Sequence, residues 1–169
     1  MRTERETLDS LSSESFLMRS AIELRDDLYR FTAATVRDRD LADDIVQETL
    51  LRAHRESEPV DNPRAWCFAV TLNLIRSHFR RRRFLPLSWA DRSAGWDVIE
   101  AQGVRRDVHR ALGTLRPEDR SALLLHILAG FSYAEIAGFS GTTEAAVKQR
   151  VYRARDAFRR AYQGGKRDA

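Results

Sequence analysis

Cysteine, lysine and long apolar runs are scarce in this sequence, and these absences exclude several classes of protein. Cys67 is the single cysteine among 169 residues, so the chain cannot build a disulfide framework. Cys67 lies in an apolar helical run, where a core position is expected. The four histidines are scattered and show no spacing typical of metal ligands. We therefore expect no metal and no other cofactor.

Membrane, targeting and catalytic signals are also missing. No segment approaches the run of about 18 apolar residues that a membrane-spanning helix requires. The N-terminal segment MRTERETLDSLSSES is charged and has no apolar stretch typical of a signal peptide. We find no nucleophile–base pair and no phosphate-binding loop, so the sequence gives no support to an enzyme. The expectation is a cytoplasmic protein with no membrane insertion and no catalytic activity.

Basic charge is carried almost entirely by arginine. The formal net charge is +4, yet Lys148 and Lys166 are the only lysines. Arginine binds phosphate through two hydrogen bonds and stacks on bases, which favours nucleic acid over a membrane surface as the partner. A high-GC genome also enriches arginine, so composition alone leaves both explanations open.

Apolar residues recur at helical spacing along most of the chain, and no stretch has the alternation of a half-buried strand. The sequence predicts an all-α fold of two small helical domains, a three-helix unit over 13–83 and a four-helix unit over 104–163. Residues 84–103 lack a sustained period and indicate a flexible linker. This linker contains Trp89 and Trp96, which are costly to expose, so we expect it to dock on a partner. Polar tails are expected at 1–12 and 164–169.

The segment Phe131–Tyr162 has the pattern of two helices that lie at an angle and are joined by a tight turn. Ser132 is placed to cap a first helix over 133–137. Gly138 and Gly141 follow, and glycines tolerate the positive φ of a turn, so we expect them to end that helix. The pattern predicts a helix-turn-helix.

The second helix of this segment begins after Thr143, whose hydroxyl can cap it. Val147, Val151, Ala154 and Phe158 recur at helical spacing and form one stripe for burial. The opposite side and its flanks carry small, polar, basic and aromatic residues: Ala145, Lys148, Gln149, Arg150, Tyr152 and Arg153. Such a helix can enter a DNA major groove, although a plain helical hairpin with a solvated basic face has the same pattern.

An acidic helix follows the polar break at residues 37–40, with Asp40 as its expected cap. Its inward face is expected to contain Leu41, Ile45, Val46, Thr49, Leu50 and Ala53. Asp44, Gln47 and Glu48 lie together on the outer side. This acidic side is either a solvated face or a surface that meets a basic protein.

The next helix begins after the loop Val60, Asp61 and Asn62 and ends in a run of arginines. It has two apolar stripes, so we expect it to be buried on much of its circumference. Asn73 is polar among these apolar neighbours, either as a satisfied buried amide or as a group turned toward a ligand. The basic residues at the helix end are Arg76, Arg80, Arg81, Arg82 and Arg83. They are a phosphate-binding candidate, or else a solvated helix end.

Three of these runs, in this order, resemble the extracytoplasmic-function (ECF, group 4) sigma factors of the sigma-70 family. ADDIVQETLLRAHR resembles region 2.2, which in this family docks on the clamp helices of RNA polymerase. NPRAWCFAVTLNLIRSHFRRRR resembles regions 2.3 and 2.4, which open and read the −10 promoter element. The run from Ala111 to Arg155 resembles region 4, which reads the −35 element. The resemblance implies a bacterial, stress-responsive transcription initiation factor.

The resemblance also implies roles for individual residues. Polymerase would bind Asp44, Gln47 and Glu48. The −10 element would contact Val60, Asp61, Asn62, Asn73, Arg76, Arg80, Arg81, Arg82 and Arg83. The −35 element would contact Thr143, Ala145, Lys148, Gln149, Arg150, Tyr152 and Arg153.

The implied partners are core RNA polymerase, through its β′ clamp helices and β flap, then promoter DNA and an anti-sigma protein. Two alternatives stay open. One is a helix-turn-helix regulator that acts outside polymerase. The other is a sigma-like decoy that binds an anti-sigma protein.

Overall fold

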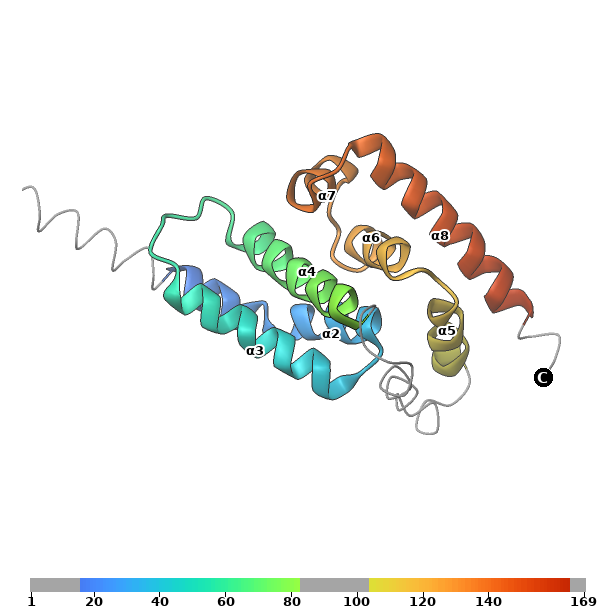
Figure 1. Ribbon diagram of the computed structural model, residues 1–169, viewed down its shortest axis with the longest axis horizontal. Coiled ribbons are helices and arrows are strands. Elements are labelled where there is room, and N and C mark those ends of the chain that lie inside the picture. The colour runs from blue at the N-terminus through green and yellow to red at the C-terminus, as the bar shows by residue number, and fades with distance from the viewer. Residues whose placement is uncertain (1–15, 83–103, 165–169) are drawn as a thin grey trace, which may run out of the picture.

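The computed structural model describes residues 16–82 and 104–164, and every regular element in these two ranges is a helix (Figure 1). The predicted all-α fold is therefore confirmed. The predicted N-terminal tail, residues 165–169, the linker tryptophans and Arg83 lie outside the described residues. Gly164, predicted to begin the C-terminal tail, is instead the last residue of α8. None of the described helices has the length and apolar character that a membrane crossing requires.

The first unit contains a helical stretch at 16–23, then α2 (Arg25–Val36), α3 (Arg39–Arg55) and α4 (Pro63–Arg82). The periodicity before Val36 predicts one helix, but a turn at Leu24 interrupts it. At Arg37 the backbone is left-handed, with φ of 61°, which ends α2. The Asp38 side chain then caps α3 by accepting a hydrogen bond from the Leu41 amide at 3.0 Å. The expectation that Asp40 is the cap is wrong, because α3 begins one residue before it.

The second unit contains α5 (Val104–Gly113), α6 (Pro117–Ile127), α7 (Tyr133–Ser140) and α8 (Glu144–Gly164). Ser132 caps α7 as predicted, in a reciprocal capping box with Glu135. Gly138 does not end α7, since a single glycine is tolerated inside a helix. The helix continues to Ser140 and stops at Gly141, which has a φ of 63°.

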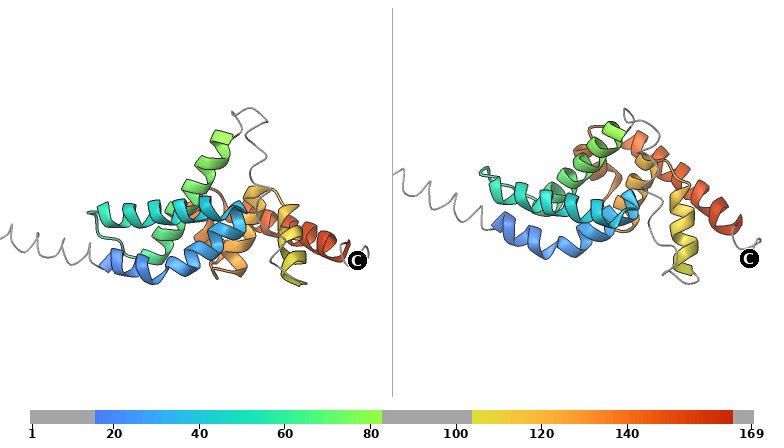
Figure 2. Two further views of the ribbon diagram at one scale, coloured as in Figure 1. Left: turned by 90° about the horizontal axis from the view of Figure 1, so that it is seen from below. Right: turned by 60° about the horizontal axis from the view of Figure 1, so that its bottom comes forward.

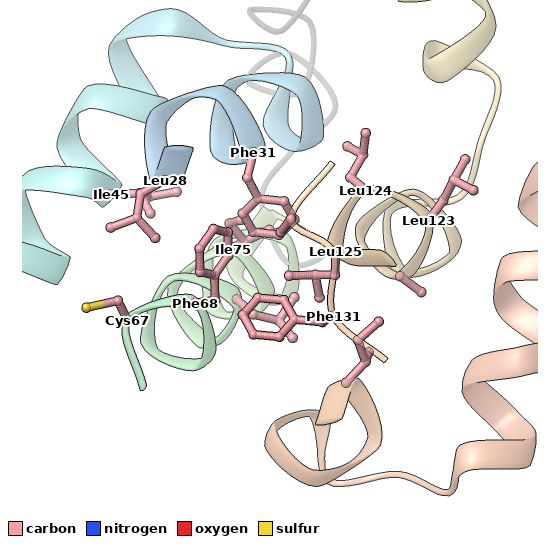
Figure 3. Packing of buried hydrophobic residues seen from close by; sticks show 14 of the residues in the cluster. Leu28, Phe31, Ile45, Cys67, Phe68, Ile75, Leu123, Leu124, Leu125 and Phe131 are labelled. Atoms are coloured by element: carbon pink, nitrogen blue, oxygen red, sulfur yellow. The ribbon is translucent and has the colours of Figure 1, made fainter. Parts of the chain in front are cut away.

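A single hydrophobic core joins the two units (Figure 3). The ring of Phe68 on α4 packs against Phe31 of α2, with centroids 5.6 Å apart, and against Phe131 of the second unit at 5.1 Å. Helix α2 packs on α6, and α4 packs on α7. In all views the units lie side by side, while α5 and the C-terminal part of α8 extend away from the first unit (Figures 1 and 2). The sequence predicts both units but not this contact.

Arginine side chains add polar contacts across the same boundary. Arg64 of α4 donates to the carbonyl of Ala129, and its guanidinium lies 4.4 Å from the centre of the Phe131 ring. From α6, Arg120 donates to the carbonyl of Thr35, at the end of α2, at 2.7 Å. The two units are therefore held by aromatic packing and by cations that bond to carbonyl groups.

Candidate nucleic-acid and protein interfaces

Helix α8 presents its basic side to solvent. The Thr143 hydroxyl accepts a hydrogen bond from the Ala146 amide at 3.2 Å, so the predicted cap is present. The core stripe is buried at Val147, Val151 and Ala154. The predicted DNA-facing residues Ala145, Lys148, Gln149, Tyr152 and Arg153 are exposed, and Arg150 is half-buried. The side of α8 opposite the core is therefore accessible to solvent.

Two cations on this side already have acidic partners. Lys148 Nζ lies 2.8 Å from Glu144 Oε1, one turn earlier on the same exposed helix surface. The hydrogen bond to Glu144 raises the pKa of Lys148. Arg153 Nη2 lies 3.0 Å from Asp119 Oδ1 on α6, and this hydrogen bond raises the pKa of Arg153. Both side chains stay fully charged at neutral pH.

The loop before α4 and Asn73 are both open to solvent. Asp61 and Asn62 are exposed and Val60 is half-buried, while Asn62 Oδ1 caps α4 by accepting from the Ala65 amide at 3.0 Å. Asn73 is also exposed, so the possibility of a buried amide is wrong. Along a helix with a rise of 1.5 Å per residue, Asn73 lies about 15 Å from the loop. The loop and Asn73 therefore do not form one compact pocket.

The basic end of α4 faces the second unit. Arg80 and Arg81 are exposed, whereas Arg76 is half-buried and donates to the carbonyl of Ser140 at 2.9 Å. Burial, and then the neighbouring Arg150, lower the pKa of Arg76. A cleft of about 990 Å³ lies here, with Leu72, Ile75, Phe79, Leu125 and Ile136 among its apolar residues and Arg76, Arg80, Arg116 and Arg150 among its polar ones. Candidate contacts for two different DNA elements thus face one cleft.

The outer face of α3 carries acidic and polar residues together with one exposed leucine. Asp44 and Gln47 are exposed, and Glu48 is half-buried and accepts from Arg52 at 2.8 Å. Leu51, one turn after Gln47, is 47% exposed. Leu51 was not predicted as part of this face. A leucine on the outer side of an otherwise polar helix face was the one feature of the sequence that could have indicated it. The α3 face is defined here as Asp44, Gln47, Glu48 and Leu51.

A second apolar surface, also missed, lies between α5, α6 and α8. It is a groove of about 680 Å³ whose lining includes Val108, Leu112, Leu124, Ile127, Phe158 and Tyr162. Ile127 is 57% exposed at its edge, and the rings of Phe158 and Tyr162 stack with centroids 5.8 Å apart. Helical periodicity places Leu124, Ile127 and Phe158 on apolar faces, but it cannot distinguish a filled core from an open groove. We call this surface the region 4 groove.

Among the described residues, no cluster of histidine, cysteine or acidic side chains could hold a metal ion. Cys67 is buried, as expected from its neighbours, and burial raises the pKa of its thiol to about 11.

Comparison with known proteins finds relatives that match both helical units. The family model described as Sigma-70 region 2 matches residues 22–84, and the model described as Sigma-70, region 4 matches residues 105–158. The chain is 38% identical over 124 residues to the ECF RNA polymerase sigma factor EcfG of Rhodopseudomonas palustris, covering 69% of this chain and 68% of that protein. It is 32% identical to the ECF RNA polymerase sigma factor SigL of Mycobacterium tuberculosis, covering 78% and 80% of the two chains.

The fold is also similar to a solved structure of the sigma factor RpoE from Bartonella quintana, which was crystallised in complex with the anti-sigma factor NepR. The TM-score is 0.69 and the identity is 26%, over 86% of this chain and 95% of that one. The sequence matches span both helical units in the order that the motifs indicate. The chain therefore belongs to the ECF sigma factors of the sigma-70 family, which are non-catalytic transcription initiation factors.

Proposed function

We propose that this chain, as a group 4 sigma factor, binds core RNA polymerase in the bacterial cytoplasm and directs it to stress-responsive promoters. The α3 face would dock on the β′ clamp helices, and the region 4 groove would take an apolar segment of the β flap. The observation that carries the proposal is the separation of charge: an acidic face on α3 for protein, and basic faces on α4 and α8 for DNA.

Different residues would contact the two promoter elements. Residues 60–62 and Asn73 would hold unstacked bases of the −10 element at two separate points, with Arg76 and Arg80–Arg83 on the backbone. On α8, Gln149 and Arg153 would read −35 base edges, because amide and guanidinium groups match adenine and guanine edges in the major groove. Lys148 and Arg150 lie on the flanks, where phosphate contacts are expected. Thr143, Ala145 and Tyr152 complete the surface that faces the −35 element.

Simultaneous binding to both elements requires the two units to part. The elements lie about two helical turns apart, or about 70 Å. Arg76 and Arg150 face the same cleft in this structure, where neither can reach a separate DNA site. The segment 83–103 would be long enough as a tether, since a fully extended chain of this length spans about 70 Å.

Charge reversal on the α3 face tests the polymerase contact. Asp44→Lys combined with Glu48→Lys is expected to weaken binding to core polymerase in a pull-down by about tenfold or more, because buried charge pairs at interfaces are costly to break. Asp26→Lys, at an exposed acidic position of α2, is the matched control and should bind normally. Unaltered binding by the folded double variant would contradict the assignment.

An anti-sigma protein is a further expected partner. The support is the similarity to the Bartonella sigma factor, which was solved bound to one. The basic residues of the cleft would suit an acidic segment of such a protein. Copurification from the native cells should yield a 1:1 partner. A free and constitutively active chain in unstressed cells would argue against it.

The regulator and decoy alternatives have less support. A regulator outside polymerase leaves the α3 face without a role. A decoy needs no basic recognition helix, yet α8 presents one. Stimulation of core polymerase separates the sigma factor from both alternatives.

A further inference from the structure

Asp119 is a buried acid that makes its ion pair with the recognition helix. It belongs to the first turn of α6 and is only 7% exposed. Its carboxylate meets Arg153 of α8 at 3.0 Å, although 34 residues separate the two in the sequence. The Arg153 side chain itself is 55% exposed. One end of this pair is therefore fixed in the protein, while the other reaches the surface.

The start of α6 favours a negative charge at the position of Asp119. Pro117 begins α6, and the preceding Arg116 offers no side-chain cap, so the positive end of the helix is open to an acid in the first turn. A buried carboxylate is costly unless it is paired. Arg153 is the ion-pair partner of Asp119 in the part of the chain that the structure describes. Because Asp119 is buried, it depends on this pair more than an exposed acid would.

The other cations of α8 are held differently. Lys148 pairs with Glu144 on its own helix, with both side chains about half exposed, and such pairs restrain a side chain weakly. Arg160 pairs in the same way with Asp156. Among the described residues of α8, Arg153 is the cation whose ion pair is with a buried acid on another helix.

We propose that Asp119 is a positioning residue for −35 recognition, which holds Arg153 in the orientation that reads a base. This inference rests on the proposed function of α8. An arginine has five N–H donors, and the bond to Asp119 uses one of them, so four remain, of which a bidentate contact with guanine needs two. Holding the long side chain in place before binding removes part of the entropy cost of ordering it on DNA.

The test is a promoter library with every −35 position varied, transcribed by core polymerase with the full-length chain or its variants. Arg153→Ala should reduce discrimination at one or two −35 positions by about tenfold or more. Asp119→Asn should reduce it at the same positions by roughly three- to tenfold, and should add nothing in the Arg153→Ala background. Asp119→Glu, which keeps a carboxylate, should recover most of the preference.

Matched variants separate this effect from a general one. Asp156→Asn removes the acid that pairs with Arg160 on the same helix and should leave −35 preference unchanged. Lys148→Ala should weaken all promoters alike and lower the salt slope of binding by about one unit. Helical content and thermal unfolding report whether each variant is folded.

The outcomes are distinguishable. If Arg153→Ala leaves every preference unchanged, the assignment of α8 as a base reader fails. If Arg153→Ala changes preference but Asp119→Asn does not, or sharpens it, the positioning role alone is overturned.

If Asp119→Asn does not fold, the proposal can still be tested on the wild-type protein. The side-chain N–H signal of Arg153 in NMR spectra, assigned with Arg153→Ala, should exchange slowly both in the free protein and on a −35 duplex. Loss of that protection on DNA binding would show that Arg153 leaves Asp119, and would overturn the proposal.

Discussion

Arg120 places a buried positive charge at the junction between the two units. It is 6% exposed and donates to the carbonyls of Thr35 and Leu115. Burial, and then the nearby Arg37, lower the pKa of Arg120 to about 10, so the group is still charged at neutral pH. The carbonyl end of α2 carries a partial negative charge that stabilises such a cation. A single side chain from the second unit thus satisfies the end of a helix in the first.

Asp38 gives a test of local structure at the same scale. Replacing an N-cap aspartate by alanine removes the hydrogen bond to the Leu41 amide and costs about 1 kcal/mol in the free energy of unfolding. We expect Asp38→Ala to have this effect in chemical denaturation. Asp40→Ala, two residues later inside the first turn, is the control and should cost less. Equal losses for the two variants would contradict the assignment of Asp38 as the cap.

The contacts and exposure of individual side chains were only partly predictable from the sequence. The caps at Ser132 and Thr143 follow local rules, since a hydroxyl before a helix bonds to an amide two or three residues later. The pair of Asp119 and Arg153 depends on how α6 packs against α8, which no local pattern contains. Asn73 was ambiguous for the same reason, because its exposure depends on which parts of α4 the other helices cover.

The buried face of a helix was more predictable than the contacts of a single side chain. The buried residues Ile45, Val46 and Thr49 of α3 lie on the predicted inward face. The apolar surface of α4 meets neighbours from both units, because α4 packs on α2 and α3 within its own unit and on α7 of the other. Phe68 itself contacts both Phe31 and Phe131. Periodicity shows that a face is buried, but it does not identify what covers it.

The contact between α4 and the second unit can be weakened at Arg64. Arg64→Ala removes the hydrogen bond to the Ala129 carbonyl and the contact with the Phe131 ring. We expect this variant to shift the population toward parted units, seen as a larger radius of gyration in small-angle X-ray scattering. Arg30→Ala, which removes an exposed ion pair within α2, is the control. An unchanged radius for Arg64→Ala would mean that this side chain does not hold the units together.

At the scale of the whole molecule, the structure is a closed arrangement of two units, each with a candidate binding surface. The α3 face and the recognition side of α8 are exposed in it, whereas Arg76 and Arg150 face the cleft between α4 and the second unit. Binding to polymerase through the α3 face and the region 4 groove would draw the units apart and free both arginines for DNA. Under the proposed function, polymerase binding and promoter recognition would be linked, because the first would supply the separation that the second requires.

Run-off transcription with core polymerase tests this account most directly. Purified chain and core polymerase are mixed with genomic DNA fragments from the source bacterium, and the start sites are mapped. The account predicts new start sites that depend on the chain and are preceded by two shared sequence elements about two helical turns apart. The chain bearing Asp44→Lys and Glu48→Lys should not produce them. If the chain adds no start sites to those of core polymerase alone, or binds those fragments and reduces transcription, it is not the initiation factor proposed here.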